Sequence, residues 1–157
     1  MKTIETKVYR YEELDSFAKN RALSYFSDIN INEDWWQPTY ETWSEMCVRI
    51  KSFDLYTKYL ELEYWGDFID VATSIVSFFG KGHEGYKFAQ DYLNANENLT
   101  EDEMEDADGL FYSDLKECIL DWLDSEWNYL MSEEIVEETI IDRGIEFTKD
   151  GRVFDYE

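Results

Sequence analysis

Four carboxylates in the second half of the chain have the spacing of one helix face. They step by three, four and three residues, as Asp114, Glu117, Asp121 and Asp124. Residues three and four apart are neighbours on a helix surface, so these side chains form one stripe. Their separation along the helix axis is roughly 4.5–6 Å, of the same order as the roughly 3.4 Å rise between phosphates of one DNA strand. The stripe therefore predicts a surface that can occupy phosphate sites on a basic protein.

The stripe lies in the most acidic part of the sequence. Residues 88–142 contain 18 Asp and Glu and a single base, Lys116, so they carry −17 of the net charge of −23. Packing like charges costs folding free energy through self-repulsion, and a small domain needs a net charge of only about 2–8 for solubility. We therefore expect a basic partner surface, against the alternative that these are solvated faces of an acid-rich protein. The predicted partner-binding residues are Glu101, Asp102, Glu105, Asp106, Asp108, Asp114, Glu117, Asp121, Asp124, Glu133, Glu134, Glu137 and Glu138.

Catalytic and metal-binding motifs are incomplete in this chain. With Gly109 at the sixth position of an EF-hand loop, Met104 and Leu115 take the first and twelfth positions, where acidic ligands are required. His83 is the only histidine and has no accompanying Ser or Cys motif. Among 37 acids some pair will always have hydrolase-like spacing, so spacing alone identifies no active site. The sequence predicts a protein that is not an enzyme and has no metal site and no cofactor.

Composition indicates one folded domain over residues 1–157. Hydrophobic residues make up 44% and aromatic residues 18% of the chain, enough for a core despite the charge. Neither a CxxC motif nor an apolar N-terminal leader is present, and the apolar stretch near Ile69–Phe79 is too short and too polar to span a bilayer. The net charge of −23 would repel nucleic acid and anionic membranes. We therefore expect a cytoplasmic protein that binds neither directly.

Hydrophobic periodicity predicts an α+β fold that is mainly helical, with four to six helices and a small antiparallel sheet. The expected helices are Tyr11–Ser27, one from near Pro38 that includes Ile50, Asp67–Phe79, Tyr86–Asn94, Leu110–Met131 and Glu133–Asp142. The expected strands are Thr3–Tyr9, the second half of Leu55–Trp65, and a closing hairpin of Ile145–Thr148 with Val153–Phe154 around an Asp-Gly turn.

Residues typical of helix ends occur at three places in the sequence. Thr100 and Glu103 have the spacing of a capping box. Ser132 precedes the last helix as a candidate N-cap, and Gly144 follows it as a candidate left-handed stop. Trp35 and Trp36 could stack on nucleic-acid bases, but acidic residues and no basic patch surround them, so core packing is expected instead. An exposed Trp35 would suit a protein–protein contact.

Two stretches of the sequence resemble a group of small phage-encoded proteins. The first is Tyr11–Ala22 with the Trp- and Tyr-rich segment after it, and the second comprises Ser132–Ile135, Glu138–Ile140 and Phe147–Arg152. The resemblance covers only part of the chain, because Leu60–Phe79 lacks the Gly- and Ser-rich segment usual in that group. It implies phage origin, and the group has no settled activity. Separately, the composition is similar to that of phage DNA-mimic inhibitors of restriction and CRISPR systems.

Three functions are compatible with these features. The first is a phage or mobile-element inhibitor that presents carboxylates as phosphate mimics to a host DNA-binding defence protein, such as a CRISPR effector or a restriction enzyme. The second is an antitoxin or immunity protein that neutralises a basic toxin. The third is a carboxylate-dependent hydrolase. A homodimer with two-fold symmetry would extend the acidic surface to the length of a duplex.

Overall fold

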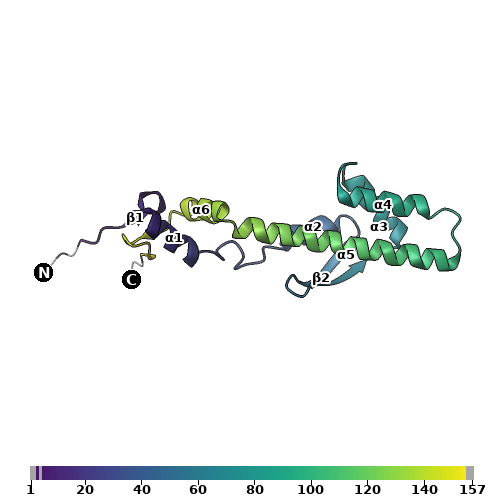
Figure 1. Cartoon of the computed structure of the whole chain (residues 1–157), viewed down its shortest axis with the longest axis horizontal. Coiled ribbons are helices and arrows are strands. Elements are labelled where there is room, and N and C mark those ends of the chain that lie inside the picture. Colours follow the sequence, from purple (N-terminus) through teal and green to yellow (C-terminus); the bar gives the residue numbers. More distant parts are fainter. Residues whose placement is uncertain (1–2, 4, 155–157) are drawn as a thin grey trace. The chain divides into compact units, whose positions relative to one another are not determined.

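The structure is a computed structural model that describes residues 3 and 5–154 (Figure 1). Its residues cluster into two compact units. We call Met1–Trp35 with Trp127–Glu157 the terminal unit, and Trp36–Glu126 the central unit. The expectation of a single domain over residues 1–157 stays a prediction.

The mainly helical α+β class is confirmed, since the described residues form six α-helices and two antiparallel two-stranded sheets. The helices are α1 (Ser16–Tyr25), α2 (Gln37–Ser44), α3 (Phe68–Phe78), α4 (Glu84–Ala95), α5 (Glu101–Met131) and α6 (Glu133–Asp142). The strands are β1 (Tyr9–Arg10), β2 (Val48–Asp54), β3 (Tyr59–Tyr64) and β4 (Glu146–Phe147), and a 3₁₀ turn, η1 (Tyr11–Glu13), precedes α1. Within the described residues, no helix has both the length and the apolar character needed to cross a bilayer.

The terminal unit is built around a core shared by α1, α6 and the β1–β4 pair. Tyr9 pairs with Phe147 and Arg10 with Glu146 in an antiparallel register. The buried core residues are Tyr11, Leu14, Ala18, Ala22, Ile29, Val136, Ile140 and Phe147. The expected closing hairpin is present, because the Thr148 N–H donates to the Arg152 carbonyl at 2.8 Å and Phe147 bridges to Val153.

The N-terminal elements are shorter than expected. The predicted strand Thr3–Tyr9 is wrong, since only Tyr9 of that range is in β1, and Ile4 lies outside the described residues. The predicted helix Tyr11–Ser27 begins at Ser16, because Asp15 is extended and its side chain accepts a hydrogen bond from the Ala18 N–H at 2.8 Å. In α1, the side chains of Phe17 and Tyr25 are 72% and 69% exposed.

In the central unit, α3 and α4 lie beside α5 (Figure 1). Aromatic side chains make the contacts between these helices. Rings from α3 and α4 converge on Phe111 of α5: Phe68, Phe88 and Tyr92 lie with their centroids 5.4, 5.6 and 4.7 Å from it. Farther along α5, the rings of Trp43 and Phe79 lie 5.7 and 5.8 Å from that of Trp122. These contacts fix which face of α5 is turned inward in the central unit.

The β2–β3 hairpin replaces part of a predicted helix. The helix that starts near Pro38 was expected to include Ile50, but α2 ends at Ser44, and Cys47 has a φ of +65°. That left-handed conformation redirects the chain into β2, where Val48 and Ile50 are buried. The strand expected in the second half of Leu55–Trp65 is confirmed as β3.

The long helix α5 begins earlier than expected. The prediction placed its start after Gly109, whereas the helix runs without interruption from Glu101 to Met131. The expected cap is confirmed, because the Thr100 hydroxyl accepts a hydrogen bond from the Glu103 N–H at 3.2 Å. Helix α6 also has its expected ends: the Ser132 hydroxyl accepts from the Ile135 N–H, and Gly144 has a φ of +62°.

Candidate functional site: an acidic face of α5

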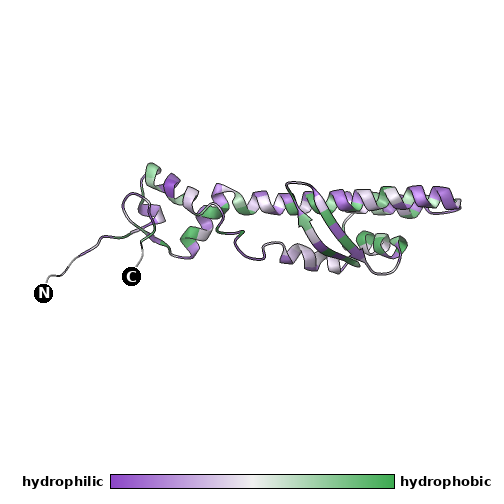
Figure 2. Ribbon diagram, turned by 90° about the horizontal axis from the view of Figure 1, so that it is seen from below, coloured by the Kyte–Doolittle hydropathy of each residue, from purple (hydrophilic) through white to green (hydrophobic). Residues whose placement is uncertain are grey.

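Helix α5 turns the predicted carboxylate stripe to solvent. Its buried residues in the central unit are Phe111, Leu115, Cys118, Ile119 and Leu123. Glu117, Asp121 and Asp124 are exposed, as the helical spacing predicted, whereas Asp114 is half-buried. Asp114 and Asp124 are separated by about 15 Å along the axis, at about 1.5 Å per residue. Figure 2 shows hydrophilic residues predominating toward the Glu101 end of the helix.

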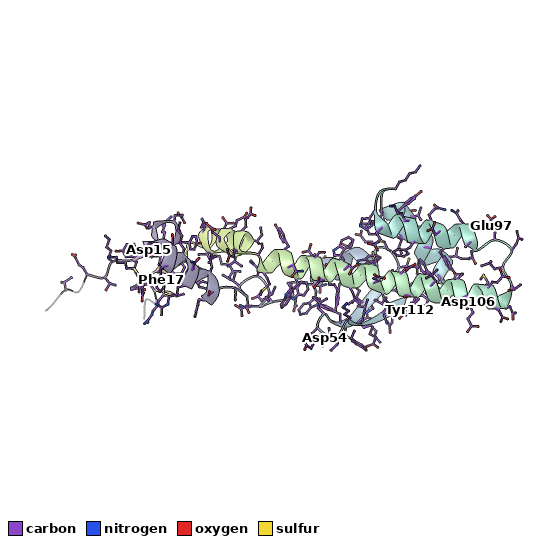
Figure 3. All side chains as sticks on the ribbon, viewed as in Figure 1. Asp15, Phe17, Asp54, Glu97, Asp106 and Tyr112 are labelled. Atoms are coloured by element: carbon purple, nitrogen blue, oxygen red, sulfur yellow. The ribbon has the colours of Figure 1, made fainter. Side chains whose placement is uncertain are left out.

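The other predicted carboxylates of α5 divide between two faces. Asp102 and Asp106 are exposed and are in helical register with Glu117; Figure 3 labels Asp106 near the start of the helix. Glu101 and Glu105 are also exposed and Asp108 is half-buried, but these three step by four and three in line with buried Leu115 and lie on a different face. The stripe therefore comprises Asp102, Asp106, Asp114, Glu117, Asp121 and Asp124, and we call it the α5 stripe.

Asp108 is engaged inside the central unit. The Tyr92 hydroxyl donates a hydrogen bond to its carboxylate at 2.5 Å, and Tyr92 is 6% exposed. Burial raises the pKa of Tyr92, and the hydrogen bond to Asp108 raises it further. Asp108 therefore joins α4 to α5, a use that the sequence did not reveal.

Two lysines lie beside the α5 stripe. A hollow of about 520 Å³ is lined by Leu55, Lys58, Ser113, Lys116, Glu117, Leu120, Asp121 and Asp124. Lys58 comes from the turn between β2 and β3, and Lys116 lies with its Nζ 5.3 Å from the centroid of the Tyr112 ring. These two bases reduce the negative charge along one edge of the stripe. Sequence reasoning missed Lys58 because the turn lies far from α5 in the chain.

The acidic residues of α6 belong to the terminal unit. Glu133, Glu134 and Glu138 are exposed and Glu137 is half-buried. Burial raises the pKa of Tyr11, and the charges of Glu137 and Glu133 raise it further. Ten of the thirteen predicted partner-binding residues therefore form two sets, the α5 stripe in the central unit and four carboxylates on α6 in the terminal unit. The other three, Glu101, Glu105 and Asp108, lie on α5 outside the stripe.

Several bases of the chain pair with acids away from both sets. Lys51 approaches Glu63 at 2.9 Å and Glu61 at 3.8 Å on the β2–β3 hairpin. The hydrogen bond to Lys51 lowers the pKa of Glu63, and the same contact raises the pKa of Lys51. In the terminal unit, Arg21 lies 3.3 Å from Asp150. These pairs neutralise acids outside α5 and α6.

The remaining candidate groups have structural positions. Across residues 3 and 5–154, no group of three or more His, Cys, Asp and Glu side chains could hold a metal ion. His83 caps α4, because its Nδ1 accepts a hydrogen bond from the Gly85 N–H at 2.9 Å. Trp35 is half-buried, with its ring 5.5 Å from that of Trp127.

Comparison of the chain with protein-family models, curated proteins and solved structures gave no match. The resemblance to small phage proteins therefore remains a prediction.

Proposed function

We propose that this protein is an inhibitor, from a phage or another mobile element, that binds a nucleic-acid-binding defence protein of the host in place of DNA. The supporting observation is the exposure of Glu117, Asp121 and Asp124 at helical spacing on α5. The proposal places the protein in the cytoplasm of the host cell and requires no enzymatic activity.

A helix is a suitable support for phosphate mimicry. Its backbone is already ordered, so binding has to immobilise only side chains, and less free energy is lost on association. Arg and Lys of a phosphate-binding channel would form charge-assisted hydrogen bonds with the carboxylates. Electrostatic attraction would make association fast and sensitive to salt.

The four carboxylates of α6 also support this function, because their mutual repulsion destabilises the helix. Glu133 with Glu137, and Glu134 with Glu138, are like-charge pairs four residues apart. Each such pair destabilises a helix by about 0.2–0.5 kcal/mol. A basic partner surface would relieve this repulsion, so we expect the α6 carboxylates to strengthen binding. A separate variant that neutralises these α6 carboxylates measures their contribution to binding.

The test is inhibition of DNA cleavage by purified restriction enzymes and guide-loaded CRISPR nucleases. The variant Asp114→Asn, Glu117→Gln, Asp121→Asn and Asp124→Asn removes four charges from the α5 stripe. We expect the unchanged protein to inhibit a nuclease in competition with its DNA. The variant should lose that inhibition, while its far-UV circular dichroism stays the same.

A matched control removes four charges elsewhere. Glu5→Gln, Glu12→Gln, Glu33→Gln and Glu45→Gln change exposed residues that lie outside α5 and α6 and should leave inhibition intact. Equal loss of inhibition in both variants would mean that inhibition depends on the net charge and not on the α5 stripe. Binding of a basic protein without competition from DNA would instead favour the antitoxin or immunity function.

A further inference from the structure

A hollow with an aromatic wall lies where the start of α4 meets α5 in the central unit. Its volume is about 380 Å³, within the roughly 300–1,000 Å³ of small-molecule sites. The lining residues are His83, Glu84, Cys118, Asp121, Trp122, Ser125 and Glu126. An indole and an imidazole therefore border the same space as three carboxylates.

The imidazole is held in a fixed orientation. The His83 ring stacks on the Phe79 ring at 3.8 Å with an interplanar angle of 2°, and its Nδ1 accepts the Gly85 N–H. A Cβ added at Gly85 would lie 2.9 Å from a Phe79 ring carbon and 3.1 Å from Nδ1 of His83. The absence of a side chain at Gly85 therefore permits this stack, and the wall of the hollow is preformed.

The indole is fixed from behind. The Trp122 ring lies 5.7 Å from Trp43, 5.8 Å from Phe79 and 6.1 Å from His83. Trp43 is fully buried, whereas Trp122 is only half-buried and lines the hollow. The face of an indole attracts a cation within about 6 Å of the ring centroid.

The pKa of the Cys118 thiol depends on its burial and on the carboxylates around the hollow. Burial raises its pKa to about 12, with further contributions from Glu84, Asp121 and Glu117. Carboxylates that disfavour a thiolate at this position favour a positive charge at the same position. Two carboxylates that line the hollow, Glu84 and Asp121, therefore make the potential at the buried thiol more negative.

We propose that this hollow binds a small organic cation, with the ammonium or guanidinium group of the ligand between the Trp122 ring and the carboxylates of Glu84 and Glu126. The stack of His83 on Phe79 would form the side of the site and exclude water from the apolar part of the ligand. This site is independent of the inhibitor function. Asp121 lines the hollow and also belongs to the α5 stripe, so the test leaves it unchanged.

The experiment is a titration of the ¹⁵N-labelled full chain, followed by NMR, with putrescine and with propylguanidinium as separate probes. At about 0.15 M NaCl the Debye length is about 8 Å, so diffuse attraction to the net charge is largely screened. We expect saturable shifts of the Trp122 indole N–H signal with at least one probe. Glu84→Gln with Glu126→Gln should weaken binding by about tenfold, as expected from the loss of two charge contacts.

Matched variants separate a site from general attraction. Glu97→Gln with Glu105→Gln removes two exposed carboxylates elsewhere in the central unit, and should leave the affinity unchanged. Trp122→Leu should weaken binding, whereas Trp65→Leu changes a tryptophan that is 53% exposed and should not. If Trp122→Leu impairs folding, the two pairs of Glu→Gln variants still decide. Unsaturable shifts spread along α5, equal affinity of the two Glu pairs, or no binding of either probe would overturn the proposal.

Discussion

Single contacts between α4 and α5 link the stability of the central unit to pH. The Tyr92 hydroxyl donates to Asp108 at 2.5 Å, and burial and this bond raise the pKa of Tyr92 above the ordinary value of 10.0. Burial also raises the pKa of Tyr11 and Tyr40. A raised pKa in the folded state gives a stabilisation that is complete below the pKa of the unfolded chain. It is lost as the pH rises from there toward the folded-state pKa.

We therefore expect the free energy of unfolding to decrease above about pH 9 through Cys118, whose ordinary pKa is 9.0, and more steeply above about pH 10 through the tyrosines. Tyr92→Phe should make this decrease smaller. At pH 7 the same substitution should lower the free energy of unfolding by about 1–3 kcal/mol, because half-buried Asp108 loses its donor. Urea unfolding followed by circular dichroism at several pH values measures both effects. Tyr56→Phe, at a side chain that is 96% exposed, is the control, and an equal pH dependence in both variants would contradict the assignment.

The closing hairpin depends on one glycine in the terminal unit. Gly151 has a φ of +88°, and an added Cβ would lie 2.2 Å from the Ala18 carbonyl oxygen. Gly151→Ala should therefore destabilise the protein by about 2 kcal/mol or more. Gly144 has a φ of +62° with open space around it, so Gly144→Ala should cost only about 1 kcal/mol. Thermal unfolding of both variants tests the difference, which is not expected if the hairpin packs loosely on α1.

At the scale of elements, a substitution at Gly109 tests whether α5 is one continuous helix or breaks at this residue. A helix that passes through Gly109 gains stability from alanine at that position, since glycine inside a helix costs roughly 0.5–1 kcal/mol. An added Cβ at Gly109 meets nothing within 4 Å. Gly109→Ala should thus raise the free energy of unfolding by that amount, and Ser113→Gly at an exposed site of the same helix should lower it. Denaturant unfolding measures both, and destabilisation by Gly109→Ala would show that the helix breaks there.

Elements with local signals were predictable from the sequence. Helix α6 begins after Ser132 and stops before Gly144 as expected, because a cap and a left-handed glycine act on neighbouring residues. Strand β2 was not predictable, since Ile50 continues the helical spacing of Trp36 and Trp43. Its pairing with β3 and the left-handed conformation of Cys47 decide the outcome, and the hydrophobic periodicity of the sequence contains neither.

The candidate site shows the same division. The exposed positions of Glu117, Asp121 and Asp124 follow from spacing within one helix, so the sequence was sufficient to predict them. Asp102 and Asp106 joined the α5 stripe only because α5 begins at Glu101, nine residues before the expected start. The inward position of Asp108 depends on Tyr92 of another helix. The hollow lined by His83 and Trp122 forms where the start of α4 meets α5. These two residues are far apart in the chain, so their proximity was not predictable from the sequence.

For the whole molecule, the net charge of −23 sets the response to salt. Self-repulsion destabilises a compact state of such charge, and the Debye length falls from about 30 Å at 0.01 M to about 10 Å at 0.1 M salt. We therefore expect the melting temperature to rise with NaCl over this range. Calorimetry at constant pH measures the rise, with KCl as a second salt to separate screening from specific ion effects.

The charge variants connect this response to function. Removing four charges from the α5 stripe should raise the melting temperature at 0.01 M salt and reduce its dependence on NaCl, because neighbouring like charges repel most strongly. The control with four charges removed outside α5 and α6 should have a smaller effect, since those residues are more widely spaced in the chain. If the α5 stripe destabilises the free protein and is also required for inhibition, its carboxylates serve partner binding and not the stability of the fold. Equal stabilisation by both variants would mean that the stripe carries no special repulsion.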